Sequence, residues 1–124
     1  MAKNWVVTKV NKKFFLRVGT KIFKCQIGKT GYKIHTKKKE GDKATPIGKW
    51  RLKSIYYRSD KVLRPIIKNK KFKINKITKN CGWCDDAKSN YYNKYINFKK
   101  NFNIKNINFE KLWREDQTYD LVIE

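Results

Sequence analysis

Three cysteines and one histidine are the residues of this chain that could support nucleophilic or redox chemistry. Cys81 and Cys84 stand in a Cys-Gly-Trp-Cys run that is followed directly by Asp85 and Asp86. A thiol attacks as its thiolate, and neighbouring carboxylates disfavour that charged form. His35 stands in a lysine-rich segment, which is more typical of a solvated side chain than of a general base. The sequence therefore predicts no catalytic residue.

The Cys-x-x-Cys spacing also occurs in zinc sites and in thioredoxin-like redox sites. A structural zinc ion takes four ligands, and beyond this pair the chain offers one distant histidine and Cys25, which an apolar strand pattern places in a core. A thioredoxin-like site needs a helix directly after the cysteines, and residues 85–90 show no helical pattern. We therefore expect neither a metal site nor a cofactor.

The clearest structural signal is a hairpin near the N-terminus. Strands are expected at 13–18 and 21–27, joined by Gly19-Thr20, because Gly at the first central position suits a type II′ turn. A two-residue loop fixes the cross-strand pairing and places large apolar side chains on one face of the hairpin. The β-branched segment 5–10 is expected to add a third strand. The apolar face comprises Phe14, Leu16, Phe23, Cys25 and Ile27.

The remainder of the chain predicts short strands, loops and one helix. A turn is expected around Pro46, which fixes its own φ angle and favours an extended residue before it. Asn108 suits a helix N-cap, and apolar residues follow it at helical spacing. In chain order we expect a loop over 28–48, a strand over 49–57, an exposed edge strand over 68–79, an ordered loop over 80–108, a short helix over 109–113 and a strand over 118–124.

The run Leu121-Val122-Ile123 is typical of a strand that is covered on both faces inside a sheet. We expect either that it pairs with an earlier segment or that the polypeptide has lost the part that would flank it. The whole pattern predicts a mainly β fold, an antiparallel meander or partial barrel with one short helix. We interpret residues 1–124 as a single, C-terminally truncated domain.

The chain is strongly basic, with a formal charge of +22 over 124 residues. Residues 1–80 carry 25 Lys or Arg against 3 acids, whereas residues 81–124 carry 7 of each. Such a surface attracts polyanions, but the excess is mostly Lys, and we interpret it mainly as background. A basic nucleic-acid-binding module is the less favoured alternative, with aromatic residues among the lysines at 68–79 and 91–105. No known nucleic-acid-binding signature supports it.

The sequence gives little information about compartment. The first residues contain no apolar run long enough for a secretory signal, and no stretch approaches the length of a membrane span. Three cysteines, an odd number, give no disulfide framework, which suits a reducing compartment or simple burial. We therefore expect no membrane span.

Several segments, in order, resemble one protein family. The chain has Gly-Asp-x-Ala-Thr-Pro-x-Gly at 41–48, Gly-Trp-Cys-Asp-Asp at 82–86 and Leu-Trp-Arg-Glu-Asp at 112–116. Each segment alone is a weak signal, and together they resemble the N-terminal portion of L,D-transpeptidase (YkuD-like) catalytic domains. Further matching segments are Cys25–Gly31, Tyr56–Asp60, Tyr92-Asn93 and Tyr119–Ile123.

The resemblance implies acyl transfer between peptidoglycan stem peptides, in the bacterial cell envelope or periplasm. In that family a Cys thiolate attacks the peptide carbonyl, with a His and a Ser/Thr-x-Gly-Cys motif completing the site. Both lie beyond the strand that corresponds here to 119–123. The resemblance therefore implies a transferase family, but also that this chain lacks the catalytic His and Cys, is inactive alone and could associate with a missing C-terminal segment.

The matching segments also supply candidates for the wall of a substrate cleft. The polar loop 40–46 and the turn 83–86 are expected to shape this wall. An equally weighted alternative is that their side chains only support the turns, by accepting backbone hydrogen bonds. The candidates are Glu40, Asp42, Thr45, Arg58, Trp83, Asp85, Asp86, Trp113 and Arg114.

Overall fold

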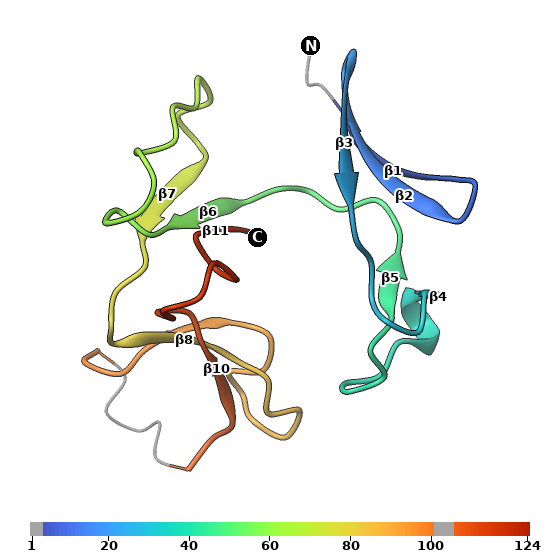
Figure 1. The fold of residues 1–124 in the computed structure, drawn as a ribbon. Helices are drawn as coiled ribbons and strands as arrows, with labels where there is room; N and C mark the ends of the chain where they lie inside the picture. The colour runs from blue at the N-terminus through green and yellow to red at the C-terminus, as the bar shows by residue number, and fades with distance from the viewer. Residues whose placement is uncertain (1–3, 101–105) are drawn as a thin grey trace. The chain divides into compact units, whose positions relative to one another are not determined.

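The computed structural model describes residues 4–100 and 106–124 (Figure 1). Contacts group the chain into two compact units, an N-terminal unit, Met1–Lys49, and a C-terminal unit, Trp50–Glu124. The interpretation of residues 1–124 as a single domain stays a prediction. The first three residues, and the 101–105 part of the aromatic segment expected above, lie outside the described residues.

The N-terminal unit begins with a three-stranded antiparallel meander of β1 (Trp5–Val10), β2 (Lys13–Val18) and β3 (Lys21–Cys25). The expected hairpin register is confirmed, because β2 and β3 pair Leu16 with Phe23 and Phe14 with Cys25. At the β2–β3 turn Gly19 has a φ angle of +60°, while the next residue has no positive φ, as a type II′ turn requires. The third strand at 5–10 is confirmed as β1.

The apolar face of this meander is less buried than the sequence predicts. Cys25 is half-buried, but Phe23 on the same face is 50% exposed and Val7 on β1 is also exposed. After the meander, β4 (Tyr32–Ile34) and β5 (Thr45–Ile47) form a parallel pair, with one 3₁₀ turn, η1 (His35–Lys37), between them. Among the described residues of this unit, the buried hydrophobic core is limited to Ala44.

The C-terminal unit contains a mixed sheet in the order β11 (Leu121–Ile123), β6 (Ser54–Tyr57), β7 (Lys73–Lys76). The central strand β6 is buried along its whole length, and it is shorter than the strand expected at 49–57. The edge strand expected within 68–79 is confirmed as β7. The prediction that 121–123 is covered on both faces is wrong, because β11 is an edge strand whose Leu121 is 47% exposed. Its pairing with the earlier strand β6 is the first of the two outcomes expected for this segment.

A second sheet in this unit is antiparallel, in the order β10 (Phe109–Lys111), β8 (Cys81–Cys84), β9 (Tyr95–Asn97). Two predictions fail here: the loop over 80–108 contains two strands, and the helix over 109–113 is replaced by β10. The helix prediction fails because β10 packs closely against β8 at Gly82. A Cβ at Gly82 would lie 2.7 Å from the Phe109 ring, so only glycine lets β10 approach β8 this closely.

The core of the C-terminal unit lies around the aromatic ring of Tyr56. This ring stacks on Tyr95 at a centroid distance of 4.9 Å and meets Trp83 edge-on at 6.0 Å. Such pairs add about 0.5–1.5 kcal/mol each beyond the burial of their area. Further core residues are Ile77, Cys81 and Leu112, with Trp113, Tyr119 and Val122 packed against them.

The fold class expected from the sequence is confirmed as mainly β, with antiparallel sheets and no closed barrel. The only helix in the described residues is the 3₁₀ turn at His35–Lys37, which is far from the position at which a helix was expected. No helix in that part of the chain is long and apolar enough to cross a membrane.

Candidate functional site

Arg58 is the organising residue of the C-terminal unit. It follows β6 directly and is 2% exposed. Its Nε and Nη2 donate to the Asp60 carboxylate at 2.9 and 2.8 Å, and its Nη1 donates to the Arg114 carbonyl oxygen. Its guanidinium carbon lies 3.8 Å from the ring centroid of Trp113. The buried cation is therefore held by a bidentate carboxylate, a carbonyl and an aromatic face.

This arrangement keeps both partners of the ion pair charged. The hydrogen bonds to Asp60 raise the pKa of Arg58, and the same bonds lower the pKa of Asp60. The backbone adds a further link, because the Arg58 N–H donates to the Asp120 carbonyl oxygen at 3.0 Å. Because each of its three side-chain nitrogens donates a hydrogen bond and the side chain is buried, Arg58 acts as a clamp between β6 and the 113–120 segment and not as an open binding group for a ligand.

Arg114 and Asp116 form a second, more exposed pair two residues apart. The Arg114 Nε donates to both carboxylate oxygens of Asp116, at 3.0 Å each. Asp116 also accepts from the Thr118 N–H at 3.1 Å. The hydrogen bonds from Arg114 and Thr118 hold the pKa of Asp116 well below its usual range. These five residues, Arg58, Asp60, Trp113, Arg114 and Asp116, are called the Arg58 cluster below.

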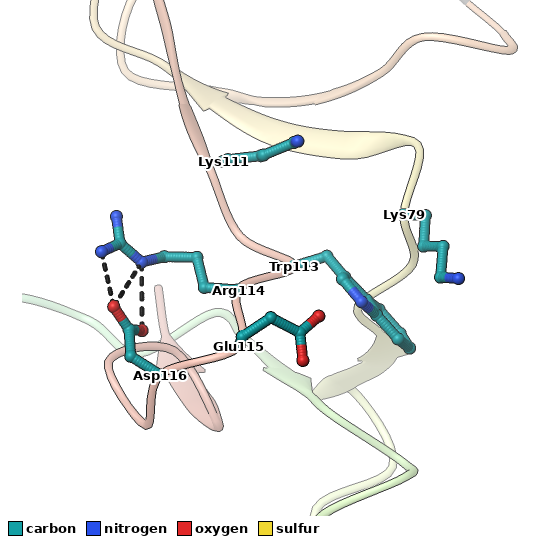
Figure 2. Close-up of a pocket in the computed structure, with 6 residues that line it drawn as sticks. All are labelled: Lys79, Lys111, Trp113, Arg114, Glu115 and Asp116. Carbon is teal, nitrogen blue, oxygen red and sulfur yellow. Dashed lines mark hydrogen bonds and ion pairs between the residues drawn. The ribbon is translucent and has the colours of Figure 1, made fainter.

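An open hollow of about 580 Å³ adjoins the Arg58 cluster (Figure 2). Its charged groups differ in how they are paired. Arg114 and Asp116 neutralise each other, whereas Lys79, Lys111 and Glu115 form no ion pair with any residue that the structure describes. The residues that line the hollow are Lys79, Lys111, Trp113, Arg114, Glu115 and Asp116.

The three candidates around β8 have structural partners and do not line this hollow. The Trp83 indole N–H donates to the Asn93 side-chain oxygen at 2.9 Å. The Asp86 carboxylate accepts the Lys88 N–H at 3.0 Å, and Asp85 is linked through its own N–H to a backbone carbonyl. These contacts favour the interpretation that the 83–86 turn is stabilised by its polar residues.

The two cysteines of β8 are inaccessible. Cys81 and Cys84 are both 0% exposed, and the Cys81 thiol donates to the Thr78 carbonyl oxygen at 3.1 Å. Side chains alternate along a strand, so two residues three positions apart point to opposite faces of the sheet. Opposite-facing sulfurs cannot chelate one ion, and within 4–100 and 106–124 no group of three or more metal-ligating side chains gathers.

The Cys81 sulfur also affects the neighbouring Tyr95. Burial, together with this sulfur, raises the pKa of Tyr95 to about 12.

In the N-terminal unit, Asp42 organises the loop between β4 and β5. Its carboxylate accepts the Lys39 and Ala44 N–H groups, both at 2.9 Å, and pairs with the Lys38 ammonium at 2.7 Å. Thr45 has a similar role, because its Oγ1 accepts the Gly28 N–H at 2.7 Å. Both candidates therefore hold the loop in its conformation.

Glu40, the third candidate of this loop, is exposed at its tip. Its carboxylate accepts the N–H of the following residue, Gly41, at 3.3 Å. Gly41 has a φ angle of +75°, a conformation that glycine adopts without strain. Glu40 therefore also contributes to the local turn.

The contacts of Asp42 predict a loop that loosens in acid. Hydrogen bonds, first from Lys38 and then from the Lys39 and Ala44 backbone, hold the pKa of Asp42 well below its usual range. Because the folded pKa is lower than the unfolded value of about 3.9, the stabilisation is complete above that value and is lost as pH falls below it. Amide exchange at Lys39 and Ala44 should therefore accelerate, relative to the intrinsic rate, between about pH 4 and pH 2.

The control for this prediction is Asp42→Asn, which keeps an acceptor and removes the titrating group. In this variant the acceleration in acid should disappear, while in Glu40→Gln it should remain. An unchanged acid response in Asp42→Asn would assign the loosening to another group.

No protein-family model, curated protein or solved structure matches this chain. Of the nine candidates from the sequence, the structure brings three together, Arg58, Trp113 and Arg114, in the Arg58 cluster. Three others lie at the 83–86 turn and three in the loop of the N-terminal unit. Four charged residues of the hollow were missed, Lys79, Lys111, Glu115 and Asp116.

Proposed function

We propose that this chain binds peptidoglycan stem peptides, as the substrate-binding portion of an L,D-transpeptidase-like domain in the bacterial cell envelope. The resemblance of 41–48, 82–86 and 112–116 to that family motivates the proposal. The observation that carries it is the Arg58 cluster: Arg58 lies 56 positions before Arg114 in the sequence, yet it is held against Trp113 and Arg114 beside an open hollow. A rigid wall with accessible charges suits recognition of a charged peptide.

The proposal is for binding and not for turnover by these 124 residues alone. Acyl transfer needs an accessible thiol with a base beside it. The printed sequence contains no Ser/Thr-x-Gly-Cys motif, and Cys81 and Cys84 are buried. Transferase activity is therefore proposed only for a domain that contains a complete catalytic site.

A titration with a synthetic tetrapeptide stem tests this function. We expect saturable changes in the NMR signals of Trp113 and Arg114, with a dissociation constant of about 1 mM, because the hollow is open and exposed charge pairs are weak. We also expect no release of the terminal D-amino acid. Tryptophan signals at Trp5, in the other unit, serve as an internal control.

The competing function is binding of single-stranded nucleic acid, and one observation favours it. The N-terminal unit has a hollow of about 780 Å³ lined by four lysines and two phenylalanine residues, residue types that can contact phosphates and stack on bases. These residues are Lys12, Lys13, Lys24, Lys29, Phe14 and Phe15. No response to the tetrapeptide, together with RNA binding that weakens steeply with salt, would place the chain in this class.

A further inference from the structure

We infer that the hollow of the N-terminal unit binds the phosphodiester backbone of an anionic polymer and does not read bases. This hollow, called the basic hollow below, is lined by the β1–β2 turn, the start of β2, the end of β3 and residues 26–29. Its volume of about 780 Å³ is in the range of sites that hold a ligand of several linked groups. The inference concerns a different unit from the Arg58 cluster, and it is independent of the stem-peptide proposal.

The charge of the basic hollow has one sign. Its charged lining residues are Lys12, Lys13, Lys24 and Lys29. All four are exposed, and none of them forms an ion pair with a residue that the structure describes. Residues 1–49 carry 14 Lys or Arg against 2 acids, and both acids belong to the loop before β5, where Asp42 pairs with Lys38. The ammonium groups of the hollow are therefore available to an anion.

Lys12 has a backbone conformation that glycine adopts more easily. Val10 and Lys13 pair across a two-residue turn, whose central residues Asn11 and Lys12 have φ angles of +49° and +64°. Positive φ angles at both central positions are the mark of a type I′ turn, in which glycine is preferred at the second position. Lysine here adds strain that glycine would avoid, and it places an ammonium at the hollow. This second observation separates Lys12 from the many other surface lysines.

The geometry of a phosphodiester suits this lining better than that of a carboxylate. The charge of a phosphodiester lies on two oxygens that leave the polymer backbone in different directions, so lysines from separate segments can reach one group. Carboxylate oxygens share a plane, which matches the planar fork of arginine. Among the described residues that line the hollow there is no arginine.

The two phenylalanines of the hollow do not form an open platform for bases. Phe14 and Phe15 are half-buried, and as neighbours on β2 they point to opposite faces of the meander. The Phe14 ring is met edge-on by Tyr32 at a centroid distance of 6.5 Å. Base stacking needs exposed rings along the path of the strand. The hollow therefore contacts the charges of a backbone and leaves the bases unread.

Four oligomers with the same number of charges test the inference on the full 124-residue chain at low salt. They are oligo(glycerol phosphate), an abasic deoxyribose phosphate oligomer, oligothymidylate and oligoglutamate. The abasic oligomer and oligothymidylate should bind within about threefold of each other, since stacking of one base would add roughly fivefold or more. Oligo(glycerol phosphate) should also bind, and oligoglutamate should bind more weakly. The tighter of the two base-free phosphate oligomers identifies the source of the backbone.

Lys12→Gly is the decisive variant, because it removes the ammonium and also relieves the turn. Its affinity for oligo(glycerol phosphate) should fall about fivefold, while its melting temperature should not fall. The slope of log K against log salt should be about −3 for the native chain, and less steep by about 0.7 in Lys12→Gly. Lys12→Arg, which keeps the charge, should retain most of the affinity.

The matched control is Lys37→Gln, which removes one exposed lysine of the same unit that does not line the hollow. It should bind almost as well as the native chain. Equal losses in Lys12→Gly and Lys37→Gln, or binding of oligoglutamate as tight as that of the phosphate oligomers, would show attraction to net charge alone and overturn the inference. Oligothymidylate that binds about tenfold more tightly than the abasic oligomer would overturn it in favour of base recognition. Absence of binding to both base-free phosphate oligomers would also overturn it, and none of these results bears on the peptide titration at Trp113.

Discussion

A single thiol of the native chain will react rapidly with an aromatic disulfide reagent, and three will react after unfolding in guanidinium chloride. Cys25 is half-buried in the N-terminal unit, whereas Cys81 and Cys84 are 0% exposed. A buried thiol reacts only when its segment opens. An opening free energy of about 4–5 kcal/mol slows the reaction by roughly a thousandfold or more. The measurement is the absorbance of the released thiolate against time, at pH 8.

The matched variant is Cys25→Ser, which should abolish the fast phase and leave the two slow thiols. A fast phase that survives in Cys25→Ser would show that a β8 cysteine is accessible. That outcome would also remove the main structural reason for proposing binding without turnover, since an accessible thiol is the first requirement for acyl transfer.

Replacement of Gly28 by alanine will release the loop that Asp42 and Thr45 organise. A Cβ at this position would lie 2.3 Å from the Lys43 carbonyl oxygen and 2.8 Å from the Cα of Ala44, and both are backbone atoms. Backbone cannot rotate away as a flexible side chain can, so the segment around Gly28 must move away from the backbone of 43–44. Overpacking of this kind costs about 3 kcal/mol, which corresponds to roughly 100-fold faster local amide exchange.

The exchange should be measured at the Thr30 and Thr45 amides, which donate across the loop at 3.1 and 2.9 Å. Gly41→Asn is the matched control. The space around Gly41 is open within 4 Å, and its positive φ angle is one that asparagine tolerates. We expect little change in that variant. Normal exchange in Gly28→Ala would show that the close approach of 28 and 44 is not needed for the loop.

The part of the fold predicted correctly is the part fixed by local rules. The meander at 5–25 has strands joined by two-residue turns, and such a turn sets the cross-strand register. The turn requires a positive φ angle at residue 19, and the glycine at this position in the sequence indicates that requirement. The β7 edge strand was also predictable, because Lys or Asn residues alternate with the apolar residues Phe72 and Ile74 in and beside it.

The part predicted wrongly depends on contacts between distant segments. Phe109, Leu112 and Trp113 have helical spacing, yet they have different roles in the structure. Phe109 pairs with Cys84 in the β8–β10 ladder, with its ring close to Gly82. Leu112 belongs to the core, and Trp113 packs against it. Strand β8 was overlooked because Cys-Gly-Trp-Cys is short, and its partners lie more than ten residues away. A local pattern cannot distinguish a helix from a short strand followed by a turn.

The candidate site shows the same division. Family resemblance led to Arg58, Trp113 and Arg114, which the fold does bring together. It gave no reason to select Lys79 or Lys111, since lysine is the commonest charged residue of this chain and residue type alone carried no signal. Only the packing of β8 against β10 shows that these two lysines border one hollow.

The pairing of β6 with β11 has a consequence for synthesis on the ribosome. The Ser54 hydroxyl donates to the Glu124 carboxylate, a partner 70 positions later in the chain. At about 5–20 residues per second, β6 waits roughly 4–14 s before the residues that pair with it are made. During that interval an apolar strand with an unpaired edge is open to nascent-chain chaperones, and slower translation would lengthen its exposure.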